Sequence, residues 1–348
     1  MTRLCYISRR YPDRLSAGNK AKSDYEDILA SMGAVNLGLK RSYGRGKAAT
    51  FFLNLAGVAR MAANIRSGDV ILLQYPVKKY FSFICRIARM RGAATVAFIH
   101  DLGSFRRKKL TPAKEIKRLR HADRIIAATD AMRDWLLGHN ISRPVDVLGL
   151  HDFLSDATPP CTPTASATPR IIYAGSLNLR KNSFLLQSDK FTDGISLTLF
   201  GNMSADEQKL LPADATITYR GFIPADKFIA TAASEGDFGL VWDGERIDTC
   251  SGDFGEYLAV NAPHKASLYL RAALPLIVWS GAAIAPIVTK KGIGISVNSL
   301  EELPKRLAAL SDGERRSMNA AVRRMAAEMA QGHAMKSAIA RAMAEIKK

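Results

Sequence analysis

The chain has 348 residues, which is longer than one typical domain, so we expect two lobes that each bury their own core. Hydrophobic residues make up 47% of the chain and charged residues 24%, a balance that excludes extensive disorder. Four cysteines lie far apart without a CxxC pair, which excludes a zinc-finger spacing and a disulfide framework and indicates a reducing cytoplasm. The first residues predict a strand rather than a signal peptide. The most apolar window, 268–288, contains an arginine and two prolines, so we expect it not to span a membrane.

The net charge of +18 is uneven along the chain. Residues 1–150 carry 28 Lys and Arg against 11 Asp and Glu, whereas residues 151–348 carry 22 against 21. A strongly positive lobe attracts nucleic acid, an anionic membrane surface or a phosphorylated substrate, and composition alone does not choose among them.

The first half alternates short β-branched or apolar runs with longer amphipathic stretches. This is the rhythm of βαβ units and predicts a parallel sheet. The expected strands are Leu4–Ser8, Val35–Leu39, Val70–Gln74, Thr95–His100, Arg124–Thr129 and Val145–Leu148.

A stretch rich in Pro, Thr, Ser and Ala, 152–169, predicts a linker between a first lobe, 1–151, and a second lobe, 170–310. The βαβ rhythm restarts after the linker, with helical stretches at Lys181–Gln187 and Ala225–Ala233. The expected strands are Arg170–Ala174, Ser196–Phe200, Ala215–Tyr219, Phe238–Trp242, Leu274–Trp279 and Ile293–Val297.

The last segment, 311–348, is predicted to be helical, and packing back on the first lobe is one option for it. Its Ser311-Asp-Gly-Glu start predicts a capping box, in which serine and glutamate cap each other's backbone N–H groups.

The second lobe opens with a strand that ends in Gly175 and Ser176, followed by a helix-like run with Arg180 and Lys181 in it. A small-residue turn at the carboxyl end of a parallel strand lets backbone N–H groups meet a phosphate, and the two cations add charge for a diphosphate. Turns of this kind are common, so a purely structural role stays equally open.

A buried strand ends in Asp243 and Gly244, which predicts an acidic turn at the sheet edge where ligands bind. Further on, Asn261 is a potential N-cap, and His264 and Lys265 fall in the first turn of the helix. Cations at a helix N-terminus oppose the helix dipole unless an anion joins them, which favours a phosphate site. The alternative is that Lys265 points into water and His264 packs.

In the first lobe, Lys20, Asp24 and Glu26 lead into a helix after the first strand and are candidates to line a cleft, although ordinary surface charges explain them equally well. His100 and Asp101 follow a strand at the edge where parallel sheets present chemistry, and a carboxylate there can act as a general base. The alternative is a capped strand end.

The segment Ser104–Arg120 holds eight Lys or Arg residues and one acid, which by default is a solvated face or a nonspecific anion patch. Phe105 is the one aromatic residue within it, and the sequence contains no helix-turn-helix, zinc-finger or RNA-binding signature. Nucleic-acid binding is therefore the second interpretation, and no specific nucleic acid is expected.

Four ordered blocks carry a resemblance to a known family. They are Phe238-Gly-Leu-Val-Trp-Asp-Gly, Cys250-Ser-Gly-Asp-Phe-Gly-Glu-Tyr-Leu, Asn261-Ala-Pro-His-Lys-Ala-Ser-Leu-Tyr-Leu and Ile293-Gly-Ile-Ser-Val-Asn-Ser-Leu-Glu-Glu-Leu. Weaker matches in the first lobe are Gly18-Asn-Lys-Ala, Gln74-Tyr-Pro, Ile99-His-Asp-Leu, Ala122-Asp-Arg-Ile-Ile and Met132-Arg-Asp-Trp-Leu. By these blocks the sequence resembles a bacterial glycosyltransferase family that contains beta-1,6-galactofuranosyltransferases of polysaccharide synthesis and glucosyltransferases that extend the first sugar on serine-rich adhesins.

The resemblance implies an α/β protein of the GT-B fold, in which two Rossmann-like, doubly wound parallel-sheet lobes face a cleft. It implies that the second lobe binds a UDP-sugar, that the first lobe presents a saccharide acceptor, and that no metal or other cofactor is essential. Lys265 would contact the donor diphosphate, assisted by Arg180 or Lys181. The other expected donor-site residues are Gly175, Ser176, Asp243, Gly244, Asn261 and His264, and those of the acceptor or cleft are Arg9, Lys20 and Asp24.

Retaining GT-B enzymes often place a glutamate at the start of the helix before a Gly-x-Pro-Val turn, and here Leu268 stands at roughly that position. Glu235 and Asp243 imitate the spacing of the retaining carboxylate pair, but Asp243 belongs to a strand end. We therefore expect an inverting enzyme that transfers galactofuranose or glucose, with Asp101 as the leading base, Glu26 behind it and His100 as a further catalytic candidate.

The basic first lobe fits an acceptor at the cytoplasmic face of the membrane, either lipid-linked or on a protein. Peripheral contact with anionic lipid and a homo-oligomer are both left open. The alternatives to an enzyme are a basic nucleic-acid-binding protein and a noncatalytic sugar-nucleotide-binding protein.

Overall fold

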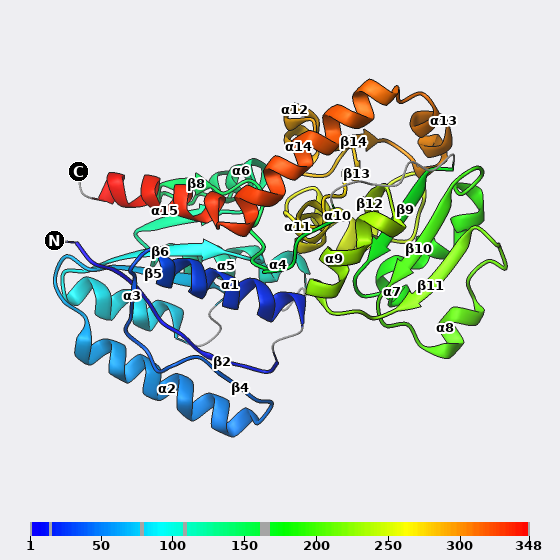
Figure 1. Ribbon diagram of the computed structural model, residues 1–348. Coiled ribbons are helices and arrows are strands. Elements are labelled where there is room, and N and C mark those ends of the chain that lie inside the picture. Colours follow the sequence, from blue (N-terminus) through cyan, green and yellow to red (C-terminus); the bar gives the residue numbers. More distant parts are fainter. Residues whose placement is uncertain (1, 14–15, 77–79, 107–109, 161–167, 347–348) are drawn as a thin grey trace. The chain divides into compact units, whose positions relative to one another are not determined.

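The computed structural model describes residues 2–13, 16–76, 80–106, 110–160 and 168–346. The chain forms two compact units, one made of Met1–Asp152 with Gly332–Lys348 and the other of Phe153–Gln331 (Figure 1). Each unit contains its own six-stranded parallel sheet.

The sheet of the first unit has the strand order β3-β1-β5-β6-β7-β8. Its long strands β5 and β6 are almost continuously apolar and buried, as expected for parallel strands that helices cover on both faces. A small parallel pair, β2 with β4, lies outside this sheet and was not predicted. The strands are β1 (Leu4–Tyr6), β2 (Arg10–Tyr11), β3 (Val35–Asn36), β4 (Ser42–Tyr43), β5 (Val70–Tyr75), β6 (Ala94–Ile99), β7 (Arg124–Ala127) and β8 (Val145–Val147).

Helices from both ends of the chain build the first unit. They are α1 (Ala17–Ser31), α2 (Lys47–Asn64), α3 (Phe81–Met90), α4 (Gly103–Arg106), α5 (Pro112–Leu119), α6 (Asp130–Gly138) and α15 (His333–Ile346). Helix α15 packs beside α1 and against β7 and β8 (Figure 1). The buried carboxylate of Asp152 accepts hydrogen bonds from the backbone N–H groups of Ala334 (3.2 Å) and Met335 (2.7 Å), and so caps the first turn of α15.

The sheet of the second unit has the order β11-β10-β9-β12-β13-β14, the order of a doubly wound nucleotide-binding fold. Strand order reverses between β9 and β12, and ligands of such sheets bind at the carboxyl ends of the strands on either side of that reversal. The strands are β9 (Arg170–Ala174), β10 (Ser196–Phe200), β11 (Ile217–Gly221), β12 (Phe238–Val241), β13 (Leu276–Trp279) and β14 (Gly294–Val297).

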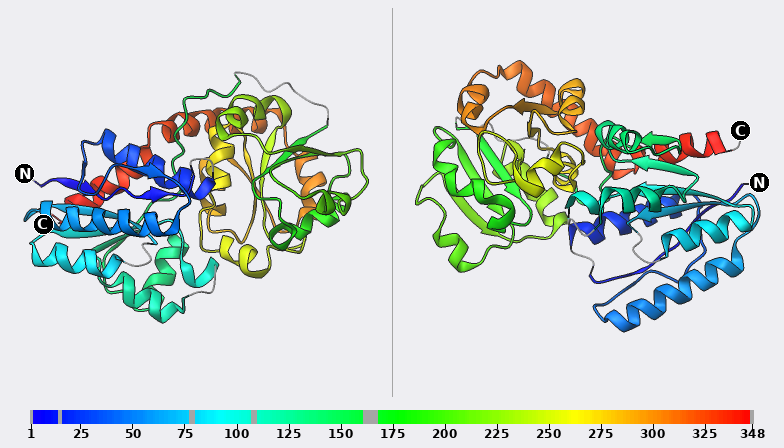
Figure 2. Two further views of the ribbon diagram at one scale, coloured as in Figure 1. Left: turned by 90° about the horizontal axis from the view of Figure 1, so that it is seen from below. Right: turned by 180° about the vertical axis from the view of Figure 1, so that it is seen from behind.

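Helices flank this second sheet, as the two further views in Figure 2 show. They are α7 (Leu179–Asn182), α8 (Ala205–Lys209), α9 (Ala225–Glu235), α10 (Gly252–Leu258), α11 (His264–Arg271), α12 (Ala285–Lys291), α13 (Leu303–Ala308) and α14 (Asp312–Ala330), with 3₁₀ turns η1 (Ser183–Lys190) and η2 (Leu300–Glu302). Helix α14 begins with the predicted capping box, and it packs on α11.

Each predicted strand corresponds to an observed one within a few residues, and the α/β prediction is confirmed. The helix predicted at Lys181–Gln187 is wrong in detail, because the chain kinks at Gln187 and forms the short α7 followed by a 3₁₀ turn. Among the residues that the structure describes, each helix is too short or too polar to cross a membrane.

The expected terminal segment 311–348 divides between the units, since α14 belongs to the second and α15 to the first. Residues 161–167 of the expected linker lie outside the described residues. The described linker residues after Asp152 are hydrogen-bonded to the second unit. Arg271 of α11 donates hydrogen bonds to the carbonyl oxygens of Ser155 (2.7 Å) and Ala157 (2.8 Å).

Candidate active site

The candidate donor site lies where strand order reverses in the second unit. After β9 the chain turns through Gly175, whose φ of +139° is a conformation that residues with a Cβ rarely adopt. Gly175 and Ser176 are both exposed. A backbone turn that is open to solvent beside a strand end is suited to approach by a phosphate.

Asp243 follows β12 and joins two lysines from different elements. Its Oδ1 lies 2.7 Å from Nζ of Lys265, the second residue of α11, and its Oδ2 lies 3.2 Å from Nζ of Lys181 on α7. The side chains of Asp243 and Lys265 are 5% and 9% exposed, whereas that of Lys181 is 24% exposed. Two ammonium groups on one carboxylate leave a net positive charge, and the more exposed Lys181 can meet an incoming anion.

The pKa values of this group follow from burial and charge. Burial lowers the pKa of the Lys265 ammonium to about 8, although the Asp243 carboxylate opposes that fall. Burial would raise the pKa of Asp243, but the ammonium groups of Lys265 and Lys181 outweigh it and hold that pKa below its ordinary value. Lys265 therefore gains or loses its charge near neutral pH.

Lys265 needs no bound anion to offset its charge at the start of α11, because Asp243 of the same chain supplies the negative charge. The sequence does not show that the end of β12 and the start of α11 meet, since 21 residues separate Asp243 from Lys265. Asp243 is thereby an internal partner of the cations. Its own contact with a donor remains a prediction.

Two tyrosines that sequence reasoning missed hold this group in place. The Tyr173 hydroxyl accepts a hydrogen bond from Lys265 (2.8 Å), and the Lys265 ammonium lies 4.2 Å from the centre of the Tyr173 ring. The Tyr269 hydroxyl accepts from the backbone N–H of Ala174 (2.6 Å) and so fixes the end of β9. Gly239 makes room for Tyr269, because a Cβ there would lie 2.3 Å from its ring. The available signal in the sequence was a tyrosine that follows two isoleucines in β9, directly before the Ala-Gly turn.

Lys181 and Arg180 occupy neighbouring positions on α7 but differ in surroundings. Lys181 joins Asp243, and its backbone carbonyl accepts a hydrogen bond from Gly244 (2.8 Å). Arg180 is exposed. The structure thus places Lys181, rather than Arg180, within the lysine–aspartate group.

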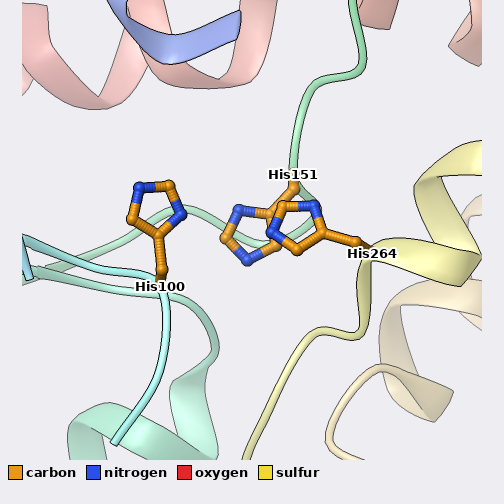
Figure 3. Close-up of side chains that lie close together, drawn as sticks. All are labelled: His100, His151 and His264. Atoms are coloured by element: carbon orange, nitrogen blue, oxygen red, sulfur yellow. The ribbon is translucent and has the colours of Figure 1, made fainter. Parts of the chain in front are cut away.

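The expected N-cap role of Asn261 is wrong. Its backbone N–H donates to the carbonyl of Tyr257 at the end of α10, and the extended Pro263 is the N-cap of α11. The side-chain oxygens of Asn261 and Ser251 are buried and have no hydrogen-bond partner in the described part of the chain. Buried polar atoms of this kind are rare without a ligand or water to satisfy them. His264, labelled in Figure 3, is the first residue of α11.

In the first unit, Lys20 and Asp24 form an ion pair (2.6 Å) on α1 and line a hollow of about 470 Å³. Arg41, Asp27 and Tyr43 also line this hollow. Arg41 pairs with Asp27 at 2.8 Å. The sequence does not reveal Arg41 and Tyr43, because they come from a loop and from the unpredicted strand β4.

Glu26 is 2% exposed, and polar partners occupy both of its carboxylate oxygens. Ser8 and Tyr11 each donate to it at 2.5 Å, and Arg41 lies 3.8 Å away. Burial raises its pKa, and the hydrogen bonds from Ser8 and Tyr11 oppose the rise. Glu26 therefore connects Ser8, Tyr11 and Arg41 within the first unit. Its carboxylate could reach an acceptor hydroxyl only if these hydrogen bonds broke.

His100 and Asp101 follow β6 but differ in exposure. His100 is buried, and its Nε2 lies 2.7 Å from Oε1 of Gln74. Its ring is nearly parallel to that of His151, with centroids 6.0 Å apart (Figure 3). Asp101 is half-buried and so is more accessible than Glu26.

The turn after Asp101 is fixed by a buried carboxylate that the sequence did not single out. Glu115 of α5 accepts from the backbone N–H groups of Gly103 and Ser104, each at 2.8 Å, and from the Tyr75 hydroxyl at 2.9 Å. This anchoring holds the turn beside the end of β6.

Arg9 is half-buried and follows β1, one of the two strands between which the strand order of the first sheet reverses. Burial lowers its pKa, and Tyr11 and Glu26 oppose the fall.

Two doubly wound units, one of them carrying cations at its strand-order reversal, define a glycosyltransferase of the GT-B fold. The chain belongs to the glucosyltransferase 3-like family, since its residues 4–150 match the N-terminal domain of that family and residues 171–342 match the C-terminal domain. The predictions of this family, of the GT-B fold and of a glycosyltransferase are confirmed.

Known proteins resemble the chain over most of its length. It is 29% identical over 300 residues to the beta-1,6-galactofuranosyltransferase WbbI of Escherichia coli K12, a match that covers 83% of each chain. It is 24% identical over 290 residues to glucosyltransferase 3 of Streptococcus gordonii, with 82% of each chain covered. Among solved structures, sucrose-phosphate synthase of Thermosynechococcus elongatus matches with a TM-score of 0.66 over 100% of both chains; at 13% identity this likeness concerns the fold alone.

Replacing Asp243 by Asn is expected to destabilise the second unit by about 3 kcal/mol, because two ammonium groups lose their buried counter-charge. Adding Lys265→Met to Asp243→Asn should recover part of that loss. Urea unfolding followed by tryptophan fluorescence measures both, since Trp242 lies next to Asp243. The control is Asp248→Asn, an exposed partner of Arg246 in the same loop, which should cost less than about 1 kcal/mol. Equal losses in the two single variants would contradict the buried network.

Proposed function

We propose that this glycosyltransferase moves a hexosyl group, galactofuranose or glucose, from a UDP-sugar to a hydroxyl of a saccharide acceptor in the synthesis of bacterial surface polysaccharide or glycoprotein. The observation that carries the proposal is the Lys181–Asp243–Lys265 group at the strand-order reversal of a nucleotide-binding sheet. The two named relatives, a galactofuranosyltransferase and a glucosyltransferase, support the choice of sugars.

The second unit is proposed to hold the donor. Gly175 and Ser176 offer backbone at an open turn, and Lys181 and Lys265 offer positive charge to the diphosphate. The unsatisfied side-chain oxygen of Asn261 is ready to accept a hydrogen bond from a hydroxyl of the donor. Gly244 and His264 are proposed to border the same site.

The reaction is proposed to be an inverting displacement. The acceptor oxygen bonds to the anomeric carbon while the bond from that carbon to the β-phosphate oxygen breaks, and the acceptor proton passes to a carboxylate. UDP departs with additional negative charge, which two ammonium groups stabilise. These ammonium groups can supply the charge that a divalent metal supplies in other transferases, and we therefore propose that no metal is essential.

The acceptor is proposed to bind in the hollow of the first unit. Asp24 and Asp27 accept hydrogen bonds from sugar hydroxyls, and Lys20, Arg41 and Tyr43 donate them. A saccharide acceptor that is lipid-linked or on a protein at the inner face of the membrane agrees with the positive charge of residues 1–150.

A donor panel tests the proposal. UDP should be released with an acceptor saccharide and one of UDP-galactofuranose, UDP-glucose and UDP-galactose, but not with a GDP-sugar, and release should persist in a metal chelator. The product should carry a β-linkage by NMR. If the protein bound UDP but released none from any pair of donor and acceptor, it would be a noncatalytic sugar-nucleotide sensor. A melting temperature raised by an oligonucleotide but not by UDP would indicate a nucleic-acid-binding protein.

Asp101→Asn is expected to lower kcat by a factor on the order of 10² to 10⁴, as the loss of a general base does, with UDP affinity unchanged. Glu26→Gln is expected to act mainly on stability, since Glu26 is buried among Ser8, Tyr11 and Arg41. A large loss of kcat in a stably folded Glu26→Gln protein, with Asp101→Asn near normal, would transfer the role of base to Glu26.

UDP affinity is expected to fall as pH rises through about 8, because Lys265 loses its charge there while bound diphosphate favours the charged form. Binding thus takes up a proton, and the dissociation constant should rise by up to about tenfold per pH unit above that point. Titration calorimetry from pH 7 to pH 9.5 measures this rise; over that range the phosphate groups of UDP stay ionised, since their last pKa is about 6. Lys265→Arg should flatten the dependence because a guanidinium stays charged. The same fall in both proteins would assign the titration to another group.

A further inference from the structure

The outer surface of the first unit carries a group of exposed apolar side chains. On α2 these are Phe51 (38% exposed), Phe52 (65%), Leu53 (37%) and Leu55 (42%), and on α3 they are Phe83 (52%) and Met90 (81%). Among the described residues, ten large hydrophobic side chains are exposed, and these two neighbouring helices hold six of them. We call these six residues the α2–α3 face, and Figure 1 shows α2 at the outside of the unit.

Helix α2 has apolar residues on both sides. Gly57, Val58 and Met61 are buried and attach the helix to its unit. On the outward side Phe52 and Leu55 are followed by exposed alanines at positions 56, 59 and 63. A surface helix normally presents charged and polar residues outward. An outer side that is also apolar indicates that another apolar surface binds there.

The chain segment that carries this face is strongly positive. From residue 28 to residue 100 the chain contains eleven Lys and Arg and a single acid, Asp69. Asp69 is buried and paired with Arg3 (2.7 Å), so it does not offset the exposed cations. The cations on the two helices include Lys47, Arg60 and Arg86, all of them exposed.

Exposed Phe, Leu and Met with surrounding Lys and Arg match the chemistry of an anionic bilayer. The apolar side chains enter the boundary between headgroups and acyl chains, and the cations attract the lipid phosphates. A second copy of this chain would bring two strongly positive units together, which repel each other. Nucleic acid would satisfy the cations but would leave the leucine, methionine and alanine side chains facing a polar backbone.

We propose that the α2–α3 face docks this enzyme on an anionic lipid surface. The face belongs to the first unit and contains none of the residues assigned to the donor site. Membrane binding and UDP binding can therefore fail independently of each other.

Flotation of the full chain with vesicles tests this docking. Wild type should float with vesicles of phosphatidylcholine and phosphatidylglycerol, bind weakly to phosphatidylcholine alone, and lose binding as salt rises. Phe52→Ser with Phe83→Ser should weaken binding at least about tenfold, because membrane affinity scales with the apolar area inserted. The matched control is Leu210→Ser with Phe222→Ser, two exposed apolar residues of the second unit, which should bind as wild type does.

A third variant separates charge from apolar contact: Arg60→Gln with Arg86→Gln should weaken binding to the anionic vesicles and reduce its salt dependence. All variants should keep the wild-type melting temperature and UDP affinity. Failure of wild type to float with anionic vesicles would overturn the proposal, as would undiminished binding of Phe52→Ser with Phe83→Ser. A wild-type oligomer in sedimentation that the Phe52→Ser, Phe83→Ser double variant dissociates would also overturn the proposal. An oligonucleotide that binds this face more tightly than the vesicles do would overturn it as well.

Discussion

The carboxylate of Asp243 is the contact on which the candidate donor site depends. It joins the end of β12, the short helix α7 and the first turn of α11, three elements far apart in the sequence. Without it, two ammonium groups would lie close together at the edge of a buried sheet, an arrangement that repulsion and lost hydration both oppose. With it, the group stays assembled and retains positive charge for an anionic ligand. Burial lowers the pKa of Lys265 to about 8 even though this contact opposes the fall, so the assembly responds to pH in the physiological range.

The sheets were predictable from sequence because short runs rich in apolar and β-branched residues, such as the one in Arg170–Ala174, are typical of buried strands. The turn at Gly175 and the cations near α11 were also visible, since each is a local pattern. The partnership of Asp243 with Lys265 was not, because it depends on which strand ends meet in space. For the same reason the role of Tyr173 escaped notice, as a buried tyrosine in a strand looks like ordinary core until its hydroxyl partner is known.

The carboxylates of the first unit show how burial separates residues of one chemical type. Glu26 is enclosed by hydroxyl donors, Glu115 holds a turn through backbone N–H groups, and Asp101 remains half-buried at a strand end. Sequence position suggested two of these as bases, yet their exposure differs widely. Accessibility, which no local pattern records, is the reason why Asp101 rather than Glu26 is proposed as the base.

The capping of α15 by Asp152 has a consequence for how the protein is made. The second unit is one continuous segment, whereas the first unit is built from both ends of the chain and includes its last helix. During synthesis from the N-terminus, the partner N–H groups of Asp152 emerge some 180 residues after it, as the separation of 183 residues to Met335 shows. The first unit thus cannot close before α15 has been synthesised, and the surface that α15 covers stays open until then.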